Sequence, residues 1–190
     1  MPKRPLTPKD LLRRLGRRSR ALACAEDGAT MIEFAILAVP FFALLGATLE
    51  TAMVFLAGQF LDSAVQDSTR MILTGQAQNT SMTAEGFRGL ICQGLYGMFD
   101  CSKLQIDVKP ITDFRSASAA IDPPLDPTDP TKWKLSPTYN PGKSSEVIMV
   151  RAYYKWPTIF NFFGFSLATQ SDGTRLLGAI RVFRNEPYAT

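Results

Sequence analysis

The sequence predicts an α+β protein in which a long hydrophobic N-terminal helix continues into an amphipathic stalk, followed by a small antiparallel sheet domain with one packed helix. Three observations carry this prediction. Residues 34–49 contain no charged side chain, apolar side chains recur every three or four positions over residues 54–72, and strand-like segments follow residue 104. We expect three segments: a basic leader at 1–28, a transmembrane and stalk helix at 29–75, and an α+β domain at 76–190.

The positive charge of the chain is concentrated at its N-terminus. Of 21 Lys and Arg and 17 Asp and Glu in the whole sequence, residues 1–28 hold eight bases and three acids, which leaves 13 bases and 14 acids for residues 29–190. Such a leader is typical of the cytoplasmic flank of a membrane-spanning helix. A nucleic-acid-binding arm would interleave aromatic residues with its bases, and residues 13–20 lack them, so we expect no nucleic-acid partner.

The chain contains no histidine, which removes the commonest general base and the commonest metal ligand. We therefore expect a protein that is not an enzyme, with no catalytic residue, no metal site and no cofactor. A Pro- and Asp-rich loop predicted at about residues 115–145 contains Asp122, Asp126 and Asp129. Their spacing matches no calcium-binding loop, and the prolines between them keep the backbone extended, so a solvated loop is the plainer interpretation.

The apolar run that begins at Phe34 is long enough to cross a bilayer as a helix. Glu33 stands directly before it. A carboxylate at the start of a membrane span is costly, which indicates a functional residue. The alternative is an acid in the first turn of a helix, where the macrodipole stabilises it.

Within and beyond this run, three further features are expected to shape the helix. Pro40 lacks a backbone N–H and predicts a kink. Glu50 lies about 25 Å of helical rise after Glu33, near the far edge of the hydrocarbon, where it contacts either water or the helix of a partner subunit. An apolar stripe then follows, which we expect to pack on the chain's own domain or on another subunit: Val54, Ala57, Leu61, Ala64, Val65, Ser68 and Ile72.

The residues before the apolar run carry a second pattern. Gly28 directly precedes Ala29-Thr30-Met31-Ile32-Glu33-Phe34, between the basic leader and the span. This arrangement resembles a type IV prepilin processing site, where a membrane peptidase cuts after glycine and glutamate becomes the fifth residue of the product. Over about residues 13–75 the chain resembles the TadE/TadG-like minor pseudopilins of tight-adherence (Flp, type IVc) pili. Asp27 departs from the basic residue that is often found beside the glycine.

The resemblance implies a minor subunit that is needed to assemble or initiate the pilus and so supports surface adhesion and biofilm formation. It implies a single-pass protein of the bacterial inner membrane, with a cytoplasmic N-terminus and a periplasmic domain, which can be incorporated in an extracellular pilus. Its partners would be the prepilin peptidase, other minor and major pilins, the inner-membrane assembly platform and the lipid bilayer. Cleavage would place the new α-ammonium of Ala29 one helical turn from Glu33, where it could compensate that charge within the chain or from a neighbouring chain.

Two alternatives to this function remain open on the sequence. The chain could be an uncleaved single-pass anchor that displays a periplasmic binding domain. It could also be a secreted hydrolase that the ordinary signal peptidase cuts after about Ala47.

The domain after the stalk contains two cysteines nine positions apart. If the domain is exported, Cys92 and Cys101 can form a disulfide that ties a helix at about 83–99, capped by Thr83 or Ser81, to the strand that follows. Two buried free thiols are the alternative. Strands are predicted at 104–108, 146–156 and 176–183, the first with apolar and polar residues alternating as in a half-buried strand.

Between the last two predicted strands the sequence is unusually aromatic. The segment either covers an edge of the sheet or forms an exposed patch that docks on a partner pilin or on the membrane surface. Its four phenylalanines are Phe160, Phe162, Phe163 and Phe165.

Overall fold

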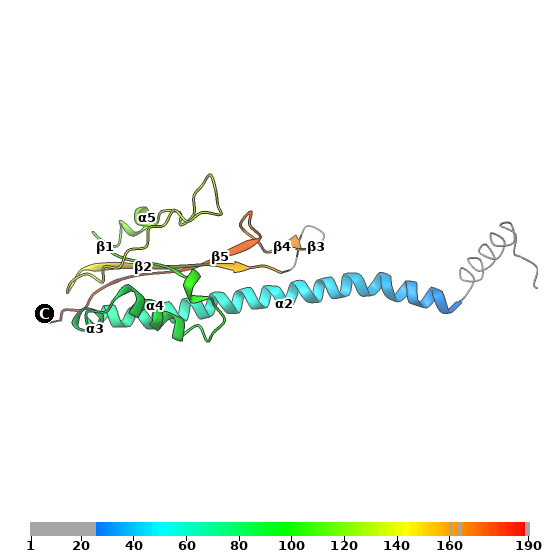
Figure 1. Cartoon of the computed structure of the whole chain (residues 1–190), viewed down its shortest axis with the longest axis horizontal. Coiled ribbons are helices and arrows are strands. Elements are labelled where there is room, and N and C mark those ends of the chain that lie inside the picture. Colours follow the sequence, from blue (N-terminus) through cyan, green and yellow to red (C-terminus); the bar gives the residue numbers. More distant parts are fainter. Residues whose placement is uncertain (1–25, 160, 163–164, 189–190) are drawn as a thin grey trace, which may run out of the picture. The chain divides into compact units, whose positions relative to one another are not determined.

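The structure is a computed structural model that describes residues 26–159, 161–162 and 165–188. Two compact units divide the chain, Met1–Ala47 and Thr48–Thr190. In the second unit short helices are followed by a strand, a long loop and two long strands (Figure 1). The predicted α+β class, with a long N-terminal helix and a small antiparallel sheet, is confirmed.

The long helix α2 (Glu26–Leu73) is continuous over 48 residues, and Pro40 lies inside it. It ends at Leu73, two residues before the predicted end at residue 75. Gly75 has a φ of 77°, a left-handed conformation that glycine adopts without steric cost. A Cβ at this position would also lie 2.6 Å from Cγ of Tyr188, so the site excludes larger residues twice over.

From Val54 onward, one face of α2 is buried. All seven residues of the predicted stripe lie on it, and Ala57, Val65 and Ile72 are inaccessible to solvent. Intervals of three and four place such residues on one side of a helix. Together with apolar side chains of the next helix and of the sheet they form one hydrophobic core. The stripe therefore packs on the chain's own domain.

Two short helices follow, α3 (Gln76–Asn79) and α4 (Ala84–Gln93). The hydroxyl oxygen of Thr83 accepts the backbone N–H of Gly86 at 3.1 Å and so caps α4, one of the two caps expected there.

The helix α4 is shorter than predicted. It ends at Gln93, about six residues before the expected end near residue 99. Tyr96 and Gly97, which come next, have φ values of 49° and 75°. A right-handed helix cannot pass through two such residues, and the apolar period after residue 93 belongs instead to a turn whose Leu95 is buried.

A disulfide joins Cys92 in α4 to Cys101, the first residue of the single-turn helix η1 (Cys101–Lys103). The turn it closes is also attached to the sheet, because the backbone N–H of Asp100 donates to the Tyr154 hydroxyl at 3.3 Å. The ring of Phe99 packs edge-on against Tyr154 with a centroid separation of 4.8 Å. The disulfide, a hydrogen bond and an aromatic contact thus hold the same turn.

The main sheet has three antiparallel strands in the order β1-β2-β5. The loop between β1 and β2 includes the short helix α5 (Ala117–Ala120), and a two-residue pair, β3 and β4, lies between β2 and β5. The strand bounds are β1 (Gln105–Ile111), β2 (Val147–Pro157), β3 (Asn161–Phe162), β4 (Phe165–Ser166) and β5 (Thr174–Arg184).

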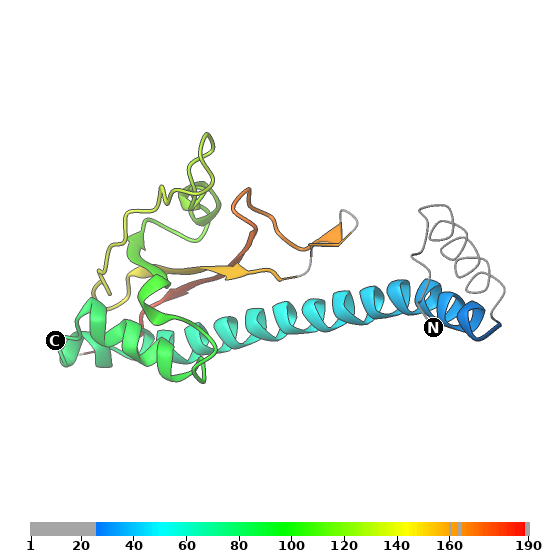
Figure 2. The ribbon, with the colours of Figure 1, turned by 45° about the vertical axis from the view of Figure 1, so that its right-hand side comes forward.

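Both faces of the central strand β2 are covered. Ile148, Val150 and Ala152 belong to the core shared with the helices. Met149 and Tyr153, on the opposite side of the pleat, are buried as well. Figures 1 and 2 both show why: the sheet lies between the helices and the long loop that joins β1 to β2.

On the loop-covered face, Asp107 and Arg151 form a buried ion pair. The two residues lie directly opposite one another in β1 and β2, with side chains only 2% and 3% exposed. Nε and Nη2 of Arg151 donate to one carboxylate oxygen of Asp107 at 3.0 and 2.6 Å. Thr138 donates its N–H and hydroxyl to the other oxygen. The period-two pattern wrongly implies a solvated Asp107, because it does not reveal that the loop returns over this face.

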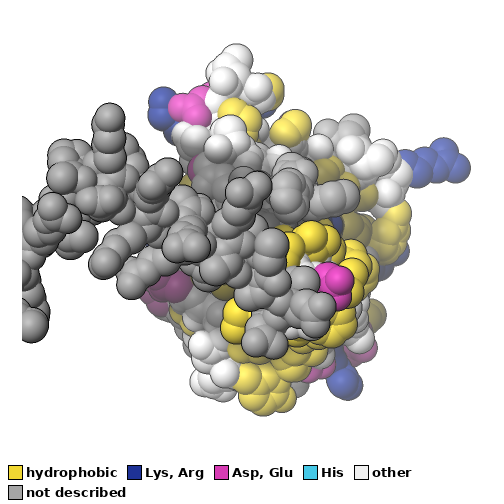
Figure 3. Space-filling view, turned by 90° about the vertical axis from the view of Figure 1, so that its right-hand side faces the viewer, with side chains coloured by type: hydrophobic (Ala, Val, Ile, Leu, Met, Phe, Trp, Pro, Cys, Tyr) yellow, Lys and Arg dark blue, Asp and Glu magenta, His cyan; other side chains and the backbone are white. Residues whose placement is uncertain are grey.

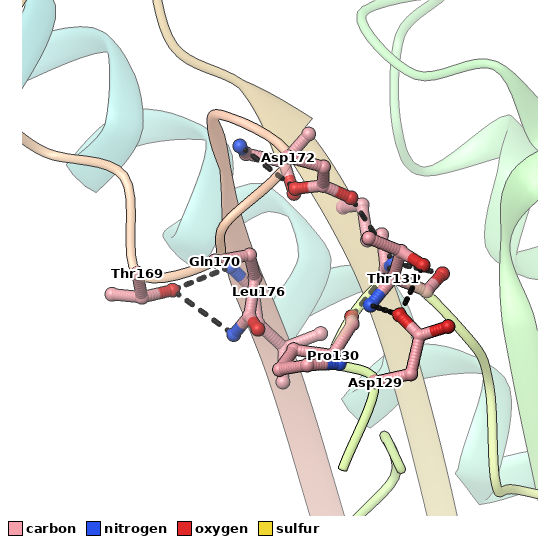
Figure 4. Close-up of polar contacts among 9 residues, drawn as sticks. Asp129, Pro130, Thr131, Thr169, Gln170, Asp172 and Leu176 are labelled. Atoms are coloured by element: carbon pink, nitrogen blue, oxygen red, sulfur yellow. Dashed lines mark hydrogen bonds and ion pairs between the residues drawn. The ribbon is translucent and has the colours of Figure 1, made fainter. Parts of the chain in front are cut away.

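The loop is fastened to the sheet at two places. At the first, Val108 exchanges backbone hydrogen bonds of 2.8 Å with Thr138 and Asn140, which covers the outer edge of β1. At the second, shown in Figure 4, Lys155 of β2 donates to the backbone oxygen of Thr131 at 2.7 Å and to Asp172 at 3.2 Å. Hydrogen bonds from Thr174, assisted by Lys155, hold the pKa of Asp172 below its usual range.

Replacing one member of the buried ion pair should destabilise the domain strongly. We expect Arg151→Met to lower the free energy of unfolding by about 3–5 kcal/mol, because Asp107 is left charged and unpaired in the interior. Tryptophan fluorescence during denaturant unfolding of the full chain in detergent micelles measures the change. The double variant Asp107→Leu/Arg151→Met should lose less than the single one, and the exposed Arg184→Met serves as control. A loss below about 0.5 kcal/mol for Arg151→Met would contradict the assignment.

Removing the disulfide should lower the free energy of unfolding by roughly 2–3 kcal/mol on the chain-entropy model for a loop of this length. The variant is Cys92→Ser/Cys101→Ser. Its control is Cys24→Ser, which replaces a cysteine outside this disulfide. The same unfolding assay, run with and without a reducing agent, measures the change. The reducing agent should destabilise the parent and leave the double variant unaffected; equal sensitivity of both would count against the bond.

Candidate functional site

The N-terminal part of α2 presents an apolar surface to its surroundings. Fourteen large hydrophobic side chains between Met31 and Leu56 are 44–77% exposed. From Thr30 onward, α2 is the one helix in the described part of the chain that is long and apolar enough to cross a membrane. A soluble monomer rarely exposes a contiguous apolar surface of this extent, which indicates membrane anchoring.

Glu33 lies in this helix with its side chain exposed. Gly28 and Ala29, the two residues of the proposed processing site, belong to the first turns of α2, and only their backbone is described. Four positions separate Ala29 from Glu33, so both lie on the same side of the helix, one turn apart. Pro40 follows two turns later on the exposed surface.

Glu50 makes a contact that neither of its two expected roles includes. Its Oε1 accepts the backbone N–H of Ile159 at 2.6 Å. Ile159 follows the end of β2, 109 positions further along the chain. A carboxylate at the end of the uncharged run is therefore satisfied by the chain's own backbone, and it joins α2 to the connection between β2 and β5.

The aromatic segment is described in part. Phe160 and Phe163 lie outside the described residues, and for Phe162 and Phe165 the structure gives the backbone, in which they pair across β3 and β4. The neighbouring Ile159 is 90% exposed. The covered sheet edge and the exposed patch therefore both stay predictions for the four phenylalanines.

The acidic residues of the long loop have local roles. Asp126 accepts hydrogen bonds from Thr128, and Asp129 accepts them from Thr131. The Thr131 hydroxyl and the nearby Lys132 lower the pKa of Asp129 to about 2. Within residues 26–159, 161–162 and 165–188, no three His, Cys, Asp or Glu side chains gather in a way that could hold a metal ion.

Sequence reasoning missed two links between α2 and the sheet domain. One is the hydrogen bond from Ile159 to Glu50; the other is the ion pair between Asp62 and Arg181 of β5. Each joins residues more than 100 positions apart, and a single sequence carries no local signal for such pairs. Only composition hinted at the first link. Residues 156–171, which include Ile159, contain no charged side chain, and neither does the apolar run of α2 before Glu50.

Comparison with known proteins finds a family match for one segment of the chain. Residues 28–70, which lie within α2 and include Glu33, Pro40 and Glu50, match the model of a family described as TadE-like protein. The searches of curated proteins and of solved structures gave no match. Over this segment the chain is similar to the TadE-like family, which is consistent with a TadE/TadG-like protein of a tight-adherence pilus.

Proposed function

We propose that this chain is a minor pilin-like subunit that is required to assemble or initiate a tight-adherence (Flp) type IV pilus and so supports surface adhesion and biofilm formation. The observation that carries the proposal is the exposed apolar helix with Glu33 near its start, in the segment that matches the TadE-like family. That family comprises pilus components and is not an enzyme family. The chemistry in this proposal is done to the chain by a peptidase.

The proposed location is the bacterial inner membrane, with the N-terminus in the cytoplasm and the sheet domain in the periplasm. The eight bases of residues 1–28 favour a cytoplasmic leader, since positively charged flanks are retained on that side. The disulfide between Cys92 and Cys101 is compatible with an oxidising compartment such as the periplasm. Charge and cysteine chemistry thus support the same orientation.

Processing would occur between Gly28 and Ala29. Glycine has no side chain to obstruct the approach of a peptidase to the backbone. The family match begins at this same glycine, which supports a boundary there. Cleavage would remove the eight bases of the leader and leave a chain with 13 bases and 14 acids.

After cleavage, Glu33 would be the fifth residue of the mature subunit. In a filament its carboxylate would lie among apolar helices, where an unpaired charge is costly. The α-ammonium of Ala29, from the same or a neighbouring subunit, would compensate it. Helix packing between pilins would then favour the register in which the two charges meet, and the assembly platform would draw subunits from the membrane in that register.

One observation favours the alternative of an uncleaved anchor that displays a periplasmic binding domain. α2 begins at Glu26, so the bond between Gly28 and Ala29 lies inside the helix. A helical carbonyl at residue 28 accepts the N–H of residue 32 and is thereby less open to attack. Cleavage therefore requires α2 to unwind around residue 28.

The mass of the mature chain separates these possibilities. In cells with a functional prepilin peptidase, the purified chain should lack residues 1–28, whereas Gly28→Val should retain the leader because its branched side chain obstructs the scissile bond. Gly46→Ala is the matched control and should be processed like the parent. An intact leader in the parent would establish the uncleaved anchor instead, and loss of residues up to about Ala47 would indicate the ordinary signal peptidase.

Replacing Glu33 tests the assembly mechanism separately from processing. Glu33→Ala should be cleaved nearly as well as the parent, yet give at least about tenfold fewer pili, since about 1.4 kcal/mol lost per contact changes an equilibrium tenfold. Sheared pili are quantified by immunoblot and the cleaved fraction by mass spectrometry. Asp67→Ala removes an exposed acid from the same helix and should leave both quantities unchanged. Parental pilus yield in Glu33→Ala would refute charge compensation.

A further inference from the structure

The hydrogen bond between Ile159 and Glu50 fixes a loop of the sheet domain at a particular level of α2. Glu50 is the first charged residue after the uncharged run of residues 34–49. Its Oε1 lies 2.6 Å from the backbone nitrogen of Ile159, a hydrogen bond strengthened by the carboxylate charge. The connection between β2 and β5 therefore begins beside the point where the apolar run of α2 ends.

The backbone next to Ile159 is held on its other side as well. The hydroxyl of Thr158 donates to the backbone oxygen of Gly173 at 2.6 Å, in the turn that precedes β5. Trp156, two residues before Thr158, packs edge-on against the ring of Phe99. With its main chain attached on two sides, Ile159 nevertheless has a side chain that is 90% exposed, more than any other large hydrophobic side chain in the described residues.

Next to Glu50, the partner of Ile159, α2 also exposes apolar side chains. On either side of Glu50 the helix exposes large hydrophobic residues: Leu49 is 60% exposed and Met53 46%. Figure 3 shows hydrophobic side chains over part of the described surface that is visible there, with several acidic and basic side chains around them. The connection itself adds no charge, because residues 156–171 contain no Asp, Glu, Lys or Arg. A surface of this composition, next to the end of a membrane span, matches the interfacial layer of a bilayer.

We propose that the start of the β2–β5 connection is a membrane-interface anchor, in which the Ile159 side chain enters the lipid leaflet from which α2 emerges and Glu50 fixes its depth. This rests on the proposed membrane span of α2. The occupant is lipid because exposed apolar side chains lie on both sides of Glu50 at the end of the apolar run, and residues 156–171 add no charge to them. The carboxylate of Glu50 is tolerated at this depth because a backbone N–H of the chain satisfies it.

The anchor has a consequence for the subunit in the membrane. A helix alone leaves the sheet domain free to tilt about the point of exit. A second contact with the lipid surface, made by a segment distant in sequence, restricts this tilt and presents the outer part of the domain at a defined height. Extraction of the subunit into a filament would then require the loss of two lipid contacts, the helix and the anchor.

Quenching by brominated lipids tests the anchor directly. The full chain, with Trp133→Phe and Trp156→Phe, is reconstituted in phosphatidylcholine and phosphatidylglycerol vesicles that carry bromine in the upper acyl chain. Ile159→Trp should lose about half of its fluorescence or more, with blue-shifted emission. Phe42→Trp, within the span, should be quenched as well. Ile121→Trp should not be quenched. The neighbouring Asp122 contacts Arg151, which lies eight residues before Ile159 and so roughly 25 Å from it along the strand.

The outcomes separate the anchor from the span. Quenching of Phe42→Trp without quenching of Ile159→Trp would overturn the anchor and leave the span intact. A blue-shifted but unquenched Ile159→Trp would assign the site to a protein contact, either within the chain or with a second copy, and would also overturn it. Absence of quenching in Phe42→Trp would overturn the span on which both proposals rest.

The positioning role of Glu50 has its own comparison. In the Ile159→Trp background, Glu50→Ala removes the hydrogen-bond acceptor and should lower the quenching at least twofold. Glu50→Gln retains an acceptor oxygen and should preserve most of it. Undiminished quenching in Glu50→Ala would show that the depth of the connection does not depend on this bond, and would overturn the role of Glu50.

Discussion

The packing of one face of α2 against the sheet is the interaction on which the rest of the domain depends. Three antiparallel strands need a hydrophobic face, or packing against a helix, for independent stability. The stripe that begins at Val54 forms one side of the core and shares it with residues of the sheet such as Ile148, Val150 and Ala179. Because these stripe residues belong to the long helix, the sheet domain cannot fold as a unit separate from α2.

The second face of the sheet is completed by polar rather than apolar means. The loop between β1 and β2 is rich in proline and aspartate and has few large apolar residues, so it cannot cover the face by hydrophobic packing alone. The buried pair of Asp107 and Arg151, together with Thr138, provides directional contacts instead. Such a pair is costly to desolvate, and its value lies in requiring one arrangement of loop and strands.

The shared helix also relates structure to the proposed function. A single element contributes to the core of the domain and carries Glu33 in a segment that matches the TadE-like family. A change of packing along α2 from Val54 onward therefore also changes the core of the domain. The hydrogen bond from Ile159 to Glu50 adds a second connection, because it joins the end of the apolar run to the segment between β2 and β5.

Local patterns in the sequence determined much of this protein. Spacing of three and four identified the buried stripe of α2, alternation of apolar and polar residues indicated β1, and Thr83 was one of two residues expected to cap α4. Each of these depends on residues close in the chain. Tertiary structure alone decided the burial of Asp107, the early end of α4 and the contact of Glu50 with Ile159. These depend on contacts between segments that are distant in sequence and come together only when the chain folds. Hydrophobic periodicity reports on neighbouring residues and does not predict such contacts.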